Sequence, residues 1–160
     1  MWATAGFTTL AGAALTSAFF AHDFSLDYVA GHSSESLTGP YLLSALWSGM
    51  EGSLLLWALM LTVFSAIALH RARTTSPRLV AWAGVVLAGV AAFFLALVLI
   101  PASPFKTLSP VPADGTGLNT FLQSPGMLLH PPLLYTGFVG FSIPFAFAIT
   151  ALFTGRLDDS

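Results

Sequence analysis

One histidine inside a proline-rich run is the residue of this chain whose surroundings best suit chemistry. The run covers residues 118–135 and contains Gly126-Met127-Leu128-Leu129-His130-Pro131-Pro132. Pro131 biases His130 away from helical backbone geometry, and the two prolines stiffen the segment that leads into the next apolar stretch. A neutral imidazole held among bulky apolar side chains can ligate the iron of a large, planar, apolar cofactor such as haem.

Spacing alone leaves two interpretations of His130 open. The first is an interfacial histidine that caps a helix, and the second is an axial iron ligand, since one imidazole does not select a metal. In the second interpretation, Met127, Leu128 and Leu129 form an exposed apolar patch that would pack against the faces of a porphyrin. Trp47 is a further candidate for that contact.

The other histidines favour local roles over ligation. His70 begins a basic link and is expected to be solvated at a helix C-terminus. His22 lies beside Asp23, where capping or a surface hydrogen bond is expected, and His32 lies in a serine-rich loop. The chain has no cysteine, so it offers no disulfide, thiolate ligand or thiol chemistry of its own.

The elements that must position these residues are membrane-spanning helices. Charged residues make up 8% of the chain and apolar or aromatic residues 56%, whereas a soluble domain is about a quarter charged. Four charge-free stretches reach the length of about 20 helical residues that a bilayer requires, and their continuous apolar character argues against a barrel. The sequence therefore predicts one all-α integral membrane domain over residues 1–160, with spans at 2–21, 52–69, 79–100 and 133–153.

The few charges predict the orientation. Arginines lie between the second and third spans and after the fourth. The other two connections contain acidic residues, and Lys106 is their only lysine or arginine. The positive-inside rule then places the first residue in the cytoplasm and segments 22–51 and 101–132 outside. A signal peptide is the alternative for the first span, but no basic region precedes it. The net charge of −2 gives no support for nucleic-acid binding.

The outer segments contain two short helical patterns. From Pro40 onward, with Gly39 as a possible cap, the spacing predicts an amphipathic helix lying on the outer leaflet. Its apolar positions are Leu42, Leu43, Leu46, Trp47 and Met50, and Ser44 and Ser48 lie on the other side. Residues 118–123 predict one helical turn that ends at Pro125-Gly126. Glu51 opens the second span, either as a favourable first-turn carboxylate or as a polar contact above the spans.

Three blocks of sequence together resemble a known family. They are Asp23-Phe24-Ser25 with Tyr28-Val29-Ala30; Ala45-Leu46-Trp47-Ser48-Gly49 with Glu51-Gly52-Ser53-Leu54-Leu55-Leu56-Trp57; and residues 118–135 continuing into Phe145-Ala146-Phe147-Ala148-Ile149 and Gly155-Arg156-Leu157-Asp158. The chain resembles the CcmF family of cytochrome c haem lyase subunits, including its nitrite-reductase-associated relatives.

The resemblance implies a role in cytochrome c maturation in the bacterial inner membrane. In that family, the histidine of the matching His-Pro-Pro-Leu-Leu-Tyr motif is an outward-side axial ligand of the haem to be attached, and His130 takes this position. The family receives haem from the chaperone CcmE. With CcmH- and CcmI-type partners it joins the haem vinyl groups to cysteines of apocytochrome c, which implies that this chain binds haem b transiently, as substrate.

The chain departs from the family pattern in extent and in single residues. Family members usually have a further span before the first one here, and they continue past Arg156 into a tryptophan-rich outer segment. The second outward histidine and the ligands of a resident haem b belong to that part, so this chain does not assign them. We expect an N-terminal portion of the family fold, which is a fragment, a truncation or the partner of a separate C-terminal CcmF-like chain. Met50, Thr120 and Ser124 replace the usual histidine, proline and aspartate.

Two other functions stay open from the sequence. The chain could be a non-catalytic membrane scaffold or half-protein that docks other haem-handling subunits, and we do not expect it to complete catalysis alone. A small transporter subunit is disfavoured, because the spans carry no ionisable residue where an intramembrane relay would place one.

Overall fold

The computed structural model describes residues 1–74 and 77–155, and this part of the chain consists of helices joined by loops. Four helical segments are long and apolar enough to cross a membrane: α1, α4, α5 and the continuous pair α6–α7. The prediction of an all-α integral membrane protein is confirmed. The elements are α1 (Trp2–Phe20), α2 (Asp27–His32), α3 (Gly39–Ala45), α4 (Met50–Ala72), α5 (Pro77–Leu99), the 3-10 helix η1 (Thr120–Leu122), α6 (Pro125–Gly140) and α7 (Ser142–Thr154).

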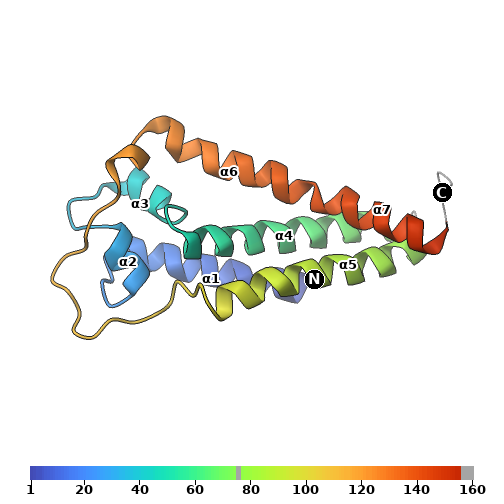
Figure 1. Cartoon of the computed structure of the whole chain (residues 1–160), viewed down its shortest axis with the longest axis horizontal. Coiled ribbons are helices and arrows are strands. Elements are labelled where there is room, and N and C mark those ends of the chain that lie inside the picture. Colours follow the sequence, from blue (N-terminus) through green and yellow to red (C-terminus); the bar gives the residue numbers. More distant parts are fainter. Residues whose placement is uncertain (75–76, 156–160) are drawn as a thin grey trace.

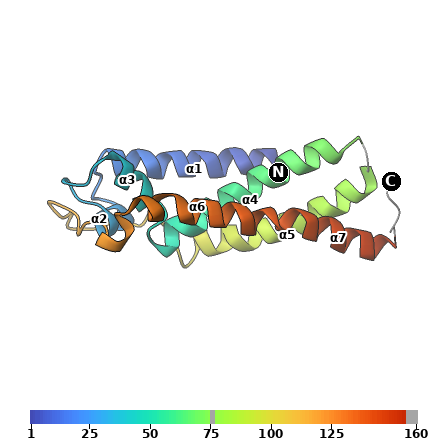
Figure 2. The ribbon, with the colours of Figure 1, turned by 90° about the horizontal axis from the view of Figure 1, so that it is seen from above.

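The long helices form an elongated bundle with two different ends. Helix α4 contacts both α1 and α5, and α7 packs against α5. Helices α2 and α3 and the two long connections lie at one end, which we call the loop end (Figures 1 and 2). The α4–α5 link lies at the opposite end, which we call the arginine end because Arg71, Arg73 and Arg78 are there. Figure 1 also shows α6 leaning away from α4 towards the loop end.

Close packing of small and polar residues joins the spans, as expected where lipid gives no hydrophobic drive between helices. The hydroxyls of Thr8 and Thr62 lie 2.8 Å apart and are buried between α1 and α4. A cluster of buried residues that includes Leu61, Leu87 and Ala146 joins α4, α5 and α7. A second cluster joins the spans to α2 and α3 at the loop end.

The connection between α5 and η1 is a loop, as predicted, and backbone hydrogen bonds fix it over the first outer segment. The amide of Asp27 donates to the Lys106 carbonyl at 2.8 Å, and the amide of Thr116 donates to the Ala30 carbonyl at 2.8 Å. A Cβ at Gly115 would overlap the Ser33 carbonyl oxygen, so only glycine allows the backbones to approach this closely. The two outer segments therefore fold as one cap on the bundle.

The fourth span starts earlier than the sequence predicted, at Pro125 instead of residue 133. Ser124 is the N-cap, and its hydroxyl accepts a hydrogen bond from the Met127 amide at 3.4 Å. Pro125 occupies the first helical position, where its missing N–H has no cost. Pro125-Gly126 thus begins a helix, and the short turn predicted before it is confirmed as η1.

The prediction that His130 lies outside helical geometry is wrong. Pro131 and Pro132 are inside α6, and the helix continues through them to Gly140. Proline fixes φ near the helical value, so the bias acting on the preceding residue is overcome once the flanking turns are formed. The two prolines contribute no N–H, so the carbonyls of Met127 and Leu128 lack their usual helical donors. The two prolines therefore cost α6 two backbone hydrogen bonds.

The predicted outer helix is present as α3, but its extent and faces differ. It begins at Gly39 with Thr38 as N-cap, and it ends at Ala45. Ser44, expected on the polar side, is only 2% exposed, whereas Leu43 is 43% exposed. The reason is that α3 packs against α1 and α6, so its buried face is set by these neighbours and not by its own apolar stripe.

Candidate functional site

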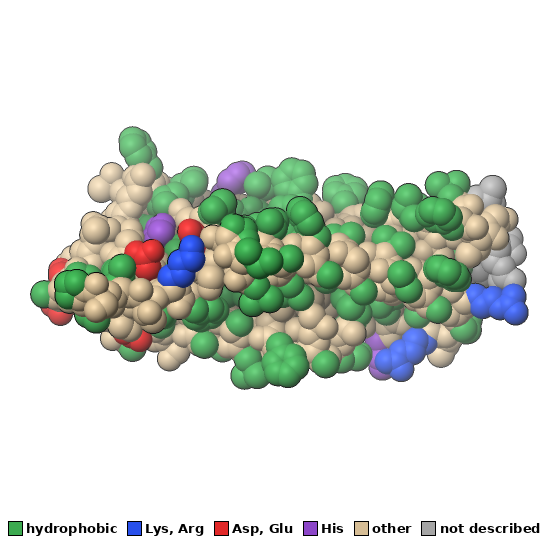
Figure 3. All heavy atoms as spheres, turned by 60° about the horizontal axis from the view of Figure 1, so that its bottom comes forward, with side chains coloured by type: hydrophobic (Ala, Val, Ile, Leu, Met, Phe, Trp, Pro, Cys, Tyr) green, Lys and Arg blue, Asp and Glu red, His purple; other side chains and the backbone are tan. Residues whose placement is uncertain are grey.

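His130 lies in the second turn of α6, at the loop end, and its side chain is exposed. Among the described residues, no hydrogen bond to its ring is found. Acidic side chains gather at the loop end, and most basic side chains lie at the opposite end (Figure 3). The imidazole is therefore accessible and free of local bonds that would compete with a ligand.

Helical geometry decides which predicted residues share a face with His130. Positions three and four apart are neighbours on a helix, whereas positions one and two apart are not. Met127 therefore lies beside His130, and Leu128 projects from a different side of α6. Leu129 is 63% exposed on an adjoining face.

The same geometry adds two residues that sequence analysis missed. Leu133 and Leu134 follow His130 by three and four positions and are 68% and 43% exposed. They were missed because the helix was expected to begin at Leu133. The Ser124-Pro125 pair is the sequence signal that would have corrected this, since serine at the N-cap and proline at the next position favour a helix start.

Glycine keeps the surface around His130 open. At Gly126 and Gly137, four residues before and seven residues after the histidine, a Cβ would meet nothing within 4 Å. This face of α6 thus offers one imidazole, apolar leucine side chains and uncrowded backbone. These features fit a flat, apolar, iron-bearing ring. No group of three or more histidine or acidic side chains suited to holding a metal ion occurs in the described ranges.

Trp47 lies in the turn between α3 and α4, half-buried, with its Nε1 buried and without a hydrogen-bond partner among the described residues. Its carbonyl accepts from the Ser53 hydroxyl at 2.9 Å, and Ser53 in turn accepts from the Tyr135 hydroxyl at 3.1 Å. This chain of hydrogen bonds ties α6 to the α3–α4 turn. These hydrogen bonds connect Trp47 through Ser53 and Tyr135 to the helix that carries His130, and not to His130 itself.

An aromatic cluster reinforces the attachment of α6. The Trp57 ring lies 5.3 Å from Phe94, 5.8 Å from Tyr135 and 6.4 Å from Phe138, measured between ring centroids. Aromatic pairs at these separations are favourable beyond simple burial. Residues of the second and third sequence blocks therefore meet here and position the helix that carries His130.

Tyr28 joins the first sequence block to the second. Its hydroxyl donates to the Leu46 carbonyl at 3.2 Å and accepts from the Gly49 amide at 3.0 Å. A Cβ at Gly49 would lie 2.6 Å from Nε2 of His32, so a larger residue would force the His32 or Tyr28 ring to shift. Burial raises the pKa of Tyr28 to about 12, against the lowering effect of the Gly49 hydrogen bond and with a smaller contribution from the Glu51 carboxylate.

The raised pKa of Tyr28 predicts a loss of stability at alkaline pH. The folded state holds the phenolic proton more tightly than the unfolded state, whose pKa is 10.0. The stabilisation is complete below pH 10 and is lost as the pH rises towards about 12, by up to about 3 kcal/mol. The stability of the unmodified chain against unfolding in detergent should therefore fall over this range. The curve should be flatter in Tyr28→Phe, and identical slopes in the two proteins would contradict the prediction.

The remaining histidines differ in how well their expected roles hold. His70, in the last turn of α4, is exposed and lies 2.9 Å from Arg73 through Nδ1, as expected for a solvated helix end. His22 has a left-handed φ of 49°, and its Nδ1 is buried without a partner in the described structure, so the expected hydrogen bond is wrong. Asp23 instead accepts hydrogen bonds from Ser25.

His32 ends α2 and packs on Tyr28, with ring centroids 4.3 Å apart. Its Nδ1 lies 2.9 Å from the Tyr28 carbonyl oxygen. The residue also lines an open cleft of about 570 Å³ together with Ser48, Thr116 and Asn119. Glu51 lies in the first turn of α4, as predicted.

Four apolar spans capped by a folded loop end, with a histidine exposed on the fourth, define a multi-pass membrane protein with a candidate ligating site. The chain belongs to the family described as cytochrome C assembly protein, whose profile matches residues 47–158. These residues include the second sequence block from Trp47 onward, the third block and the whole of α4 to α7 within the described part.

Curated relatives align with nearly the whole chain. It is 44% identical over 158 residues to the cytochrome c-type biogenesis protein CcmF of Pseudomonas aeruginosa, covering 98% of this chain and 24% of that protein. It is 43% identical over 161 residues to CcmF of Escherichia coli K12, covering 96% and 24%. The probable cytochrome c-type biogenesis protein NrfE of Escherichia coli K12 is 41% identical over 150 residues, covering 93% and 27%. The chain thus spans about a quarter of the length of these relatives. No solved structure matches.

Proposed function

We propose that this chain acts in cytochrome c maturation and holds haem at the outer membrane face for covalent attachment to apocytochrome c. The observation that carries the proposal is the exposed, unbonded imidazole of His130 on an open apolar helix face. The names of the relatives, cytochrome c-type biogenesis proteins, support the same process. His130 would be one axial ligand of the haem iron, and bound haem would supply the vinyl groups that react.

The contribution of this chain would be positioning. Holding two reactants in a productive orientation can lower a barrier by about 7–11 kcal/mol. Met127, Leu133 and Leu134 would contact the ring beside His130, and Leu129 and Trp47 would contact its periphery. The Tyr135–Ser53 hydrogen bond and the contact with the Trp57 ring would hold α6 against α4.

We also propose the orientation and the partners. The separation of acidic and arginine-bearing ends supports a cytoplasmic N-terminus and a loop end facing the periplasm of a bacterial inner membrane. Haem would arrive from CcmE, and CcmH- and CcmI-type subunits would present apocytochrome c. The C-terminal part of the family fold, in the same protein or in a separate CcmF-like chain, would provide the second axial ligand and hold the resident haem b.

Haem binding by the isolated chain is the test of direct ligation. We expect the chain purified in mild detergent, with haem added, to show a Soret absorption band at a stoichiometry of one haem per chain. The alternative is a non-catalytic scaffold that only docks other haem-handling subunits. A Soret band that appears only when a partner chain is co-purified would favour that scaffold over direct binding.

A further inference from the structure

Two adjoining cavities lie between α5 and α7 at the arginine end, far along the bundle from His130. One, of about 340 Å³, is lined by Val85 and Val86 of α5 and by Phe153 of α7. The other, of about 460 Å³, is lined by Arg78 and Leu79. Both include Trp82 and Thr154, so they form one continuous groove with an apolar part and a cationic part.

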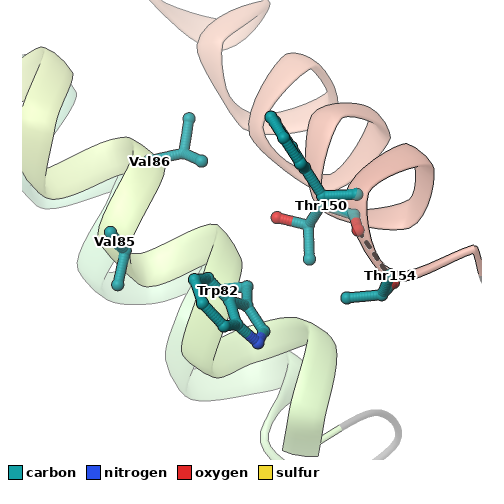
Figure 4. Close-up of a pocket in the computed structure, with 6 residues that line it drawn as sticks. Trp82, Val85, Val86, Thr150 and Thr154 are labelled. Atoms are coloured by element: carbon teal, nitrogen blue, oxygen red, sulfur yellow. Dashed lines mark hydrogen bonds between the residues drawn. The ribbon is translucent and has the colours of Figure 1, made fainter.

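The apolar part offers hydrocarbon surface and almost no free polar group. Figure 4 shows Trp82 and Val86 of α5 extending towards Thr150 and Thr154 of α7 across the space between the two helices. The hydroxyls of both threonines are already bonded within α7. Thr150 donates to the Ala146 carbonyl at 2.8 Å, and Thr154 donates to the Thr150 carbonyl at 2.8 Å. An occupant of this part must therefore be apolar.

The cationic part depends on Arg78, which is exposed in the first turn of α5. The acidic residues of the described part lie at the loop end or at the start of α4, so none of them neutralises this region. Trp82 is 60% exposed beside Arg78. A tryptophan of this kind is typical of headgroup depth in a membrane.

We propose that this groove binds one anionic phospholipid. The Arg78 guanidinium would donate to the headgroup phosphate, for which its planar fork is well suited, and an acyl chain would lie along Val85, Val86 and Phe153. A zwitterionic lipid would fill the apolar part equally well but gain less from the arginine. Inorganic phosphate shares the headgroup chemistry and lacks the chain that the apolar part requires.

The experiment measures which lipids the chain retains. The whole chain is reconstituted in nanodiscs of phosphatidylcholine with a minor fraction of phosphatidylglycerol and then transferred to detergent, and its bound lipids are quantified by mass spectrometry. Arg78→Gln should lower the retained ratio of phosphatidylglycerol to phosphatidylcholine about fivefold, which is about 1 kcal/mol for one arginine at a membrane surface. Arg71→Gln, the matched control at the end of α4, should leave the ratio unchanged.

Two further arms test the groove and the identity of the ligand. Val85→Trp, at a 62% exposed position that tolerates a larger side chain, should reduce the retention of both lipids by filling the apolar part. Equal effects of Arg78→Gln and Arg71→Gln would mean diffuse electrostatic attraction and would overturn the proposal. Displacement of phosphatidylglycerol by millimolar inorganic phosphate, or normal retention in Val85→Trp, would overturn it as well.

Discussion

Replacing His130 by alanine is expected to lower haem retention in detergent more than about tenfold, or by more than about 1.4 kcal/mol of binding free energy. The imidazole is the iron ligand of the proposed site, and apolar contacts alone would not hold the metal in place. The side chain is exposed and has no hydrogen bond in the described structure. Its removal should therefore change the stability of the spans by no more than about 0.5 kcal/mol.

The measurement is the Soret absorbance per chain after detergent exchange, with circular dichroism as the check on helix content. His70→Ala is the matched control, because His70 is also exposed but lies at the arginine end. His130→Gly offers a sharper arm, since free imidazole should restore both the haem band and its wavelength. Haem stoichiometry that is unchanged in His130→Ala would remove this residue from the mechanism.

Replacing Gly52 by alanine is expected to destabilise the loop end by about 3 kcal/mol or more, at the upper end of overpacking costs. The new Cβ would overlap the Leu46 carbonyl oxygen and lie 2.5 Å from the Tyr28 hydroxyl. The first of these is a backbone atom and cannot move away by changing rotamer. The α3–α4 turn would have to shift, and with it the hydrogen bonds that hold Tyr28 and Ser53.

Gly89→Ala is the control for that experiment. Gly89 lies inside α5, and a new Cβ there would have nothing within 4 Å. Alanine at this position should therefore be neutral or stabilise the helix by about 0.5–1 kcal/mol. The unfolding temperature of both variants would be measured by monitoring tryptophan fluorescence during heating. If Gly52→Ala unfolds at the same temperature as Gly89→Ala, the close packing at the α3–α4 turn is not what stabilises the loop end.

Sequence alone predicted the fold class and the existence of all four spans. A segment that crosses lipid must satisfy its backbone internally and carry about 20 apolar residues, and both requirements are local. The first three spans accordingly differ from their predicted bounds by only a few residues, as α1, α4 and α5 show. His130 could be selected as a candidate for the same reason, since a histidine between a polar loop and an apolar stretch is visible without coordinates.

Sequence analysis predicted the neighbours of His130 less accurately. The bias that Pro131 places on His130 is a local preference, and the Ser124 cap and the flanking helical turns override it. Once the helix starts at Pro125, Leu133 and Leu134 replace Leu128 on the face of His130. A shift in where a helix begins therefore changes the composition of the site without changing the span.

Tertiary structure alone decided how the loop end is held together. Tyr28 reaches the carbonyl of Leu46 and the amide of Gly49, and Tyr135 reaches Ser53 from another span. No periodicity or local propensity encodes such contacts, because they depend on the distance between helices that are remote in the chain. Sequence by itself determined that this chain crosses a membrane and presents a histidine near one end. The three-dimensional packing decided which side chains surround that histidine and what keeps its helix in position.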